Sequence, residues 1–161
     1  MSADLKTKYG SSGNALSITL ASLANGSARQ SAEVSNASDL FLDVLVTIKL
    51  KSATVGVSQA GYATVYAFGT TDGGTTRTEG AGSGDAAITL VNPTNLRMIG
   101  MLNMVGTSVT YVAGPFSVAQ AFGGVLPEKW GIVIENSSGA AFTATGSDHA
   151  VTYQGVYGQS V

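Results

Sequence analysis

The sequence predicts an all-β protein, an antiparallel two-sheet sandwich of about 8–9 strands, and three observations support this. Apolar residues recur mainly with a period of two. Clusters of Gly, Pro, Asn and Ser interrupt the chain at short intervals. No convincing amphipathic helix of about 10 residues is present. The 161 residues are enough for one domain with a sizeable core.

The clearest strand signal lies between Leu40 and Lys51. Its even positions are all Leu, Val or Ile, whereas Asp, Thr and Lys occupy many of the odd ones, as expected for a strand with one buried face. Eight further segments carry similar but shorter signals: Ala15–Leu20, Ser27–Val34, Tyr62–Phe68, Ala86–Val91, Leu96–Val105, Ser108–Val112, Trp130–Glu135 and Val151–Tyr157.

The remaining segments are predicted to be connections. Ser117–Phe122 precedes two glycines and is expected to form at most a short helical turn. The Gly- and Thr-rich segment Gly69–Asp85 is expected to be a long exposed hairpin loop. We expect residues 1–13 to form a flexible N-terminal arm that orders on a partner or frays, and residues 14–161 to form the sandwich.

Composition narrows the range of functions. Charged residues make up 11% of the chain and the net charge is −2, so the clustered basic residues that nucleic-acid binding requires are absent from the sequence. The sequence has no cysteine, which excludes disulfides and thiolate metal sites. Neither a signal-peptide pattern nor an apolar run of membrane-spanning length is found, so we expect no membrane partner and synthesis in the cytoplasm.

Residues suited to catalysis or metal binding are few. His149 is the only histidine and follows Ser147 and Asp148 directly. Consecutive side chains of an extended chain point to opposite faces, so these three cannot converge as a hydrolase triad, and we expect no enzyme activity and no cofactor. Calcium binding in the loop from Asp72 to Asp85 stays open as an alternative, although the acidic ligands lack EF-hand spacing.

Aromatic residues offer a different hypothesis, carbohydrate binding, because sugar rings stack on exposed aromatic faces. Tyr62 and Tyr66 share one strand face, Tyr153 and Tyr157 share another, and Trp130 stands alone. In strands such residues are more often part of a core, a cross-strand pair or a subunit interface.

The segment Leu96–Val105 is unusual because both of its faces are apolar. In a two-sheet sandwich the outer face of a strand normally contacts water. We therefore expect that face to meet another subunit or partner, with a loop of the same chain as the alternative cover. Methionines suit adaptable contacts of this kind. The residues predicted to form a protein interface are Tyr9, Leu96, Met98, Ile99, Met101 and Met104.

Several stretches resemble virion accessory proteins of tailed bacteriophages, in particular the jelly-roll cement or decoration proteins of phage heads. The stretches are Ser27–Ser31, Leu40–Lys51, Tyr66–Gly74 and Ala119–Ile132. The resemblance covers most of the chain after about Lys8, and its motifs are structural rather than chemical.

The resemblance implies a jelly-roll-like sandwich that binds the major capsid protein on the outer surface of the virion. It also implies a homo-oligomer, a dimer or a trimer, whose repeated contacts stabilise the head through avidity. The main alternative is a receptor- or carbohydrate-binding module of a phage tail or fibre, because such modules share this composition. A small hydrolase that uses His149 is a further alternative.

Overall fold

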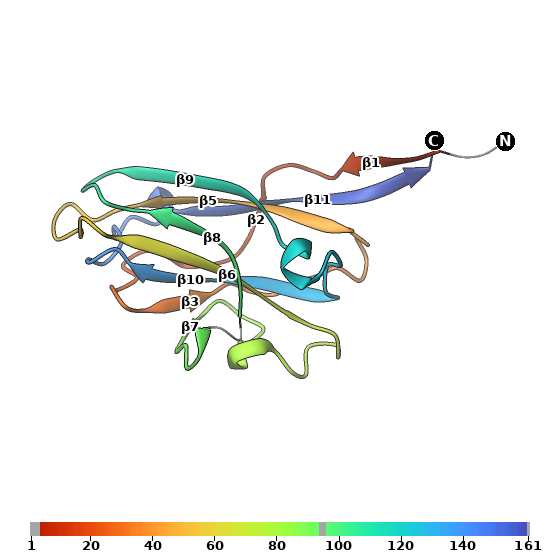
Figure 1. Cartoon of the computed structure of the whole chain (residues 1–161), viewed down its shortest axis with the longest axis horizontal. Helices are drawn as coiled ribbons and strands as arrows, with labels where there is room; N and C mark the ends of the chain where they lie inside the picture. Colours follow the sequence, from red (N-terminus) through yellow and green to blue (C-terminus); the bar gives the residue numbers. More distant parts are fainter. Residues whose placement is uncertain (1–3, 94–95, 161) are drawn as a thin grey trace.

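The computed structural model describes residues 4–93 and 96–160, and within them the chain forms eleven strands and three short 3-10 helices (Figure 1). The strands are β1 (Leu5–Tyr9), β2 (Asn14–Ala15), β3 (Ala28–Gln30), β4 (Val34–Ser35), β5 (Asp43–Lys51), β6 (Tyr62–Thr70), β7 (Ala86–Ile88), β8 (Arg97–Asn103), β9 (Thr110–Ser117), β10 (Lys129–Ser137) and β11 (Ala150–Ser160). The helices are η1 (Thr78–Gly80), η3 (Ala119–Phe122) and η4 (Gly146–Asp148).

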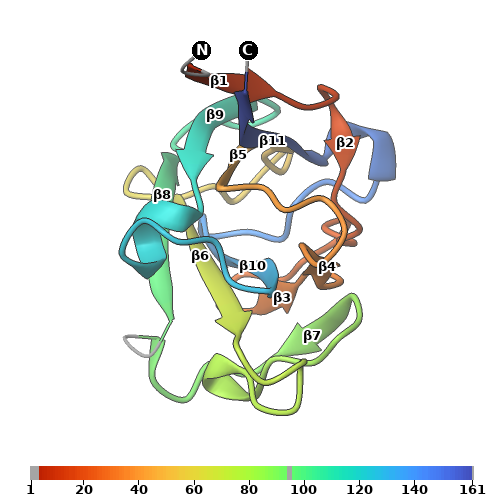
Figure 2. The same ribbon diagram turned by 90° about the vertical axis from the view of Figure 1, so that its right-hand side faces the viewer.

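The strands form two antiparallel sheets that stack as a sandwich (Figure 2). Sheet A has the order β1-β11-β5-β9, with β2 also paired to β11. Sheet B has the order β7-β3-β10-β6-β8, with β4 also paired to β10. The pairing is nested along the chain, because β2 pairs with β11, β3 with β10, β5 with β9 and β6 with β8. This nesting is the arrangement of a jelly roll, so the predicted fold class is confirmed.

Alternation along β5 supplies sheet A's main contribution to the core. Val44, Val46, Ile48 and Leu50 are fully buried, and the residues between them are only partly buried. Sheet B contributes inward-facing residues of β6 and β10 to the same cluster: Ala63, Val65, Ala67, Trp130, Ile132 and Ile134. A period-two apolar pattern thus places one face of each central strand in the shared core.

The strand predicted to begin at Leu40 begins instead at Asp43, and Leu40 and Leu42 are exposed by 71% and 60%. The side chain of Asn36 explains the difference. Its Oδ1 accepts a hydrogen bond from the backbone N of Phe41 and its Nδ2 donates one to the Phe41 carbonyl. These bonds hold residues 36–41 in a turn, in which Leu40 has a positive φ of 52°.

The predicted helical turn is confirmed, whereas two of the predicted strands are shorter than expected. The predicted turn after Ser117 forms η3, which ends at Gly123 in the left-handed conformation, as its sequence indicated. The predicted strand Ala15–Leu20 shares only Ala15 with β2, and the predicted strand Ala86–Val91 is shortened to β7.

The segment Gly69–Asp85, predicted to be an exposed hairpin loop, is instead the end of β6 and the first part of a covering segment, residues 71–93, in which Ala81 is buried. Residues of this segment pack on the outer face of sheet B, where Ala81 and Leu96 join Phe68 and Val133 in a second buried cluster. Figure 1 shows this segment, with η1 and β7, lying below sheet B. Part of sheet B's outer face is therefore covered by the protein's own chain.

Residues 5–9 of the expected N-terminal arm form β1, which pairs with the end of β11 from Leu5↔Ser160 to Tyr9↔Val156. Residues 1–3 of that arm lie outside the described residues. Every residue of β1 is exposed, and the two-stranded ribbon projects beyond the sandwich (Figure 1). We refer to β1 and residues 156–160 as the ribbon.

Gly155 gives a test of the packing near the base of the ribbon. A methyl group at this position would overlap the ring of Phe41, so Gly155→Ala is expected to destabilise the fold by about 1–3 kcal/mol. Gly146→Ala is the matched control, because nothing lies within 4 Å of its added methyl group. Urea unfolding of both variants measures the difference. Equal stability of the two variants would contradict this packing.

Candidate protein interface

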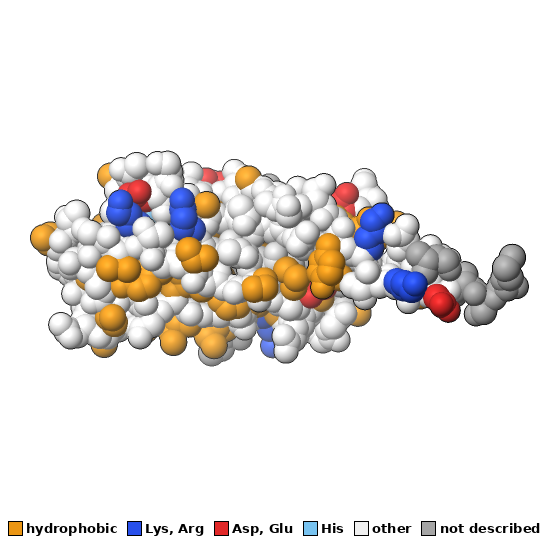
Figure 3. All heavy atoms as spheres, turned by 90° about the horizontal axis from the view of Figure 1, so that it is seen from above, with side chains coloured by type: hydrophobic (Ala, Val, Ile, Leu, Met, Phe, Trp, Pro, Cys, Tyr) orange, Lys and Arg blue, Asp and Glu red, His pale blue; other side chains and the backbone are white. Residues whose placement is uncertain are grey.

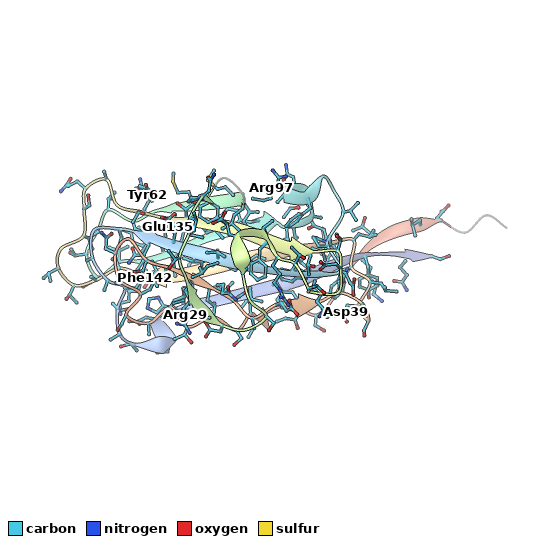
Figure 4. The ribbon with its side chains drawn as sticks, turned by 90° about the horizontal axis from the view of Figure 1, so that it is seen from below. Arg29, Asp39, Tyr62, Arg97, Glu135 and Phe142 are labelled. Atoms are coloured by element: carbon cyan, nitrogen blue, oxygen red, sulfur yellow. The ribbon has the colours of Figure 1, made fainter. Side chains whose placement is uncertain are left out.

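Two of the predicted interface residues lie on an exposed part of sheet B. Met98 and Met101 of β8 are 64% and 57% exposed, and they stand beside Tyr66 and Thr64 of β6. Tyr62 of β6 is 40% exposed near the same edge. We call Tyr62, Met98 and Met101 the β8 patch. Figure 4, which views the molecule from below, shows Tyr62 and Arg97 along one long edge.

Other predicted interface residues are buried within the chain. Met104 is fully buried in the main core, and Leu96 is 3% exposed in the second cluster, so neither side chain is available to a partner. Ile99 is partly buried against the main core. For Leu96, cover by the same chain was therefore the correct alternative.

A β-bulge explains why the two apolar faces of Leu96–Val105 were assigned wrongly. The register of β6 and β8 shifts between Val65, which faces Gly100, and Tyr66, which faces Met98. An extra residue in one strand breaks strict alternation. Met98 and Met101 thus both lie outward although their spacing is odd, whereas Leu102 points into the core.

A groove adjoins the β8 patch between β8 and β9. Its volume is about 370 Å³, and it is lined by Met98, Ile99, Pro115, Phe116, Ser117, Gln120 and Ala121. The ring of Phe116 lies over Gly100, where any Cβ would overlap it. This close approach joins the edges of the two sheets and forms the floor of the groove. The patch exposes two methionines, which can adapt to a partner, whereas the accessible surface of the groove is mainly polar.

Tyr9, the remaining predicted interface residue, belongs to a different surface. It is 57% exposed on the ribbon, at the end of the molecule where the termini lie (Figure 1). The structure therefore does not bring Tyr9 together with the β8 patch.

The residues considered for catalysis serve structural contacts. His149 Nδ1 accepts a long hydrogen bond from the backbone N of Lys51, and Nε2 lies 2.9 Å from the Thr143 carbonyl. Its ring packs beside Phe142. Asp148 forms an ion pair with Lys51 at 3.2 Å. Asp148 and His149 thus both contact Lys51, the first through its ammonium group and the second through its backbone N.

The carboxylates proposed for calcium are likewise engaged by the protein. Asp72 accepts hydrogen bonds from Thr70, Thr75 and Thr76, which hold the pKa of its carboxyl well below the usual value. Asp85 pairs with Arg29. Among residues 4–93 and 96–160, no group of three or more His, Asp or Glu side chains could hold a metal ion.

Two of the aromatic residues considered for sugar stacking, Trp130 and Tyr153, pack in the main core between the sheets. Trp130 is 1% exposed and packs edge-on against Tyr153, with ring centroids 5.2 Å apart. Tyr66 donates a hydrogen bond to Glu135, and partial burial together with this bond raises the pKa of Tyr66. Among these three and Tyr62, only Tyr62 offers an exposed ring.

Comparison with known proteins identified no relative: no family model, no curated protein and no solved structure matches the chain. Within the described residues, no helix has the length and apolar character needed to cross a membrane.

Glu33 links the segment that covers sheet B to strand β10. Arg77 of that segment contacts the Glu33 carboxylate at 2.7 Å, and Lys129 of β10 contacts it at 3.2 Å. Burial raises the pKa of Glu33, but the hydrogen bonds and charges of Arg77 and Lys129 outweigh it, so the net pKa is lowered.

This pKa shift predicts a pH-dependent stability. Because the carboxyl binds its proton less readily in the folded chain, its contribution is present above the unfolded-state pKa and is lost as the pH falls through the folded-state value. Glu33→Gln should lower the unfolding free energy by about 1–2 kcal/mol at pH 7, and the difference from wild type should shrink toward about pH 3.

Urea titrations at several pH values measure this difference. Glu128→Gln is the control, because Glu128 is exposed and takes part in none of the ion pairs among the described residues. A Glu33→Gln effect that stays constant from pH 7 to pH 3 would be inconsistent with the ion-pair assignment.

Proposed function

We propose that this chain is a non-enzymatic virion protein that binds the outer surface of a phage head as a cement or decoration protein. The observation that carries the proposal is the β8 patch, which exposes two methionines and a tyrosine at one edge of a jelly roll. The sequence stretches that resemble phage cement proteins support the same function.

The β8 patch is favoured as the binding surface because the chain itself covers another part of the outer face of sheet B. Residues between Thr71 and Leu96 cover Phe68 and Val133, but Met98 and Met101 stay in contact with water. Fully burying one such side chain contributes about 1.5–3 kcal/mol, so two methionines provide a useful contact at each copy. Many identical copies on a symmetric lattice then add their contacts through avidity.

The proposal predicts that purified protein binds phage heads that lack it, to a saturating stoichiometry, and raises their resistance to heat. Met98→Ser/Met101→Ser should weaken binding by at least about tenfold, since apolar burial is lost at both sites. Co-sedimentation over a range of protein concentrations measures the affinity, and particle survival after heating measures the stabilisation.

Val55→Ser/Val91→Ser is the matched control, because these valines are 74% and 89% exposed and lie outside the β8 patch. It should bind heads as wild type does. Failure of the wild-type protein to bind heads, together with binding on a glycan array, would replace the proposal with the tail-module alternative and direct attention to Tyr62.

A further inference from the structure

The ribbon is an unusually exposed element. Antiparallel partners share a face, so Leu5, Thr7 and Tyr9 lie with Val156 and Gly158 on one face, and Lys6 and Lys8 lie with Gln159 and Tyr157 on the other. Leu5 is 76% exposed. A two-stranded ribbon is only marginally stable by itself in water, and additional packing is needed to hold it. We therefore expect the apolar face of this ribbon to pack against another molecule.

A second exposed apolar surface lies at the same end of the molecule. It consists of residues from two adjacent loops, Asp39, Leu40, Leu42, Val125 and Glu128, which we call the end surface. A hydrogen bond from the backbone N of Asn36 to the Glu128 carbonyl joins the two loops. Leu40, Leu42 and Val125 are 71%, 60% and 72% exposed. Figure 4 shows Asp39 at the end from which the ribbon projects.

Leu40 indicates that the end surface is held in a defined shape. A leucine at positive φ is sterically unfavourable and needs support from its surroundings. Asn36 supplies that support through hydrogen bonds to the backbone of Leu40 and Phe41. An apolar side chain is thus fixed outward in a strained conformation, although burial within the chain gives it no benefit.

The two surfaces are complementary in charge. Lys6 and Lys8 on the ribbon and Asp39 and Glu128 on the end surface are all exposed, and none belongs to the four ion pairs found among the described residues. Figure 3 shows Lys and Arg side chains on the ribbon, which points away from its own sandwich. The ribbon of one molecule can therefore meet the end surface of another.

We propose that two copies of this chain form a symmetric dimer in which each ribbon docks on the partner's end surface. Because both surfaces lie at the same end, a two-fold axis satisfies both contacts at once and closes the assembly. β1 is an edge strand, so its open edge presents Leu5 and Tyr9 on one side and the lysines on the other. Lysines on an edge also oppose open-ended strand pairing.

The inference does not depend on the proposed function, and charge reversal tests it separately. Sedimentation velocity should show a concentration-dependent dimer for the wild-type chain. Lys6→Glu/Lys8→Glu and Asp39→Lys/Glu128→Lys should each weaken self-association by at least about tenfold, because like charges then face each other. An equimolar mixture of the two variants should recover the dimer, since opposite charges face each other again at both contacts.

Lys49→Glu/Arg97→Glu is the control for net charge, because it changes the total charge as much as the ribbon variant and leaves both docking surfaces intact. This control should dimerise as wild type does, and it should pair with Asp39→Lys/Glu128→Lys more weakly than the ribbon variant does, because like charges face each other at one of the two contacts. A monomeric wild type, a dimer that either double reversal leaves intact, or a mixture that stays monomeric would overturn the inference. Head binding by monomeric variants would leave the proposed function standing.

Discussion

The two sheets share one cluster of inward-facing apolar side chains, and the strands are arranged around it. Val46 and Ile48 of β5 pack in one cluster with Val65 of β6 and Ile132 of β10. Burial of this apolar surface is the main stabilising contribution to the fold. Because each strand turns one face to the core, the location of the core also decides which side chains remain outside.

The surfaces available for binding depend on which parts of each sheet are covered by other segments of the chain. Glu33 holds Arg77 and so anchors the covering segment over part of sheet B, whereas β8 at the other edge keeps Met98 in contact with water. At the far end β1 extends β11 beyond the core. The candidate contacts, the β8 patch and the ribbon, thus occur where no other segment of the chain covers the strands.

Sequence reasoning predicted the features that depend on local pattern. Alternating apolar residues predicted strand β5, and the glycines after Phe122 predicted the short turn that the structure shows as η3. The bulge in β8 could not be predicted, because one extra residue reverses the assignment of faces without any change in composition. Burial of Leu96 within the chain was stated only as an alternative, and the pairing of β1 with β11 was missed, since both depend on contacts between distant segments.

We propose that this protein binds a phage head through the β8 patch. A cryo-electron microscopy map of heads reconstituted with the protein tests this directly. We expect ordered density for the jelly roll on the outer surface of the capsid, with Met98 and Met101 against the capsid protein. A map in which the β8 patch faces solvent would contradict this proposal. So would a map of fully incubated heads that shows no density for the protein.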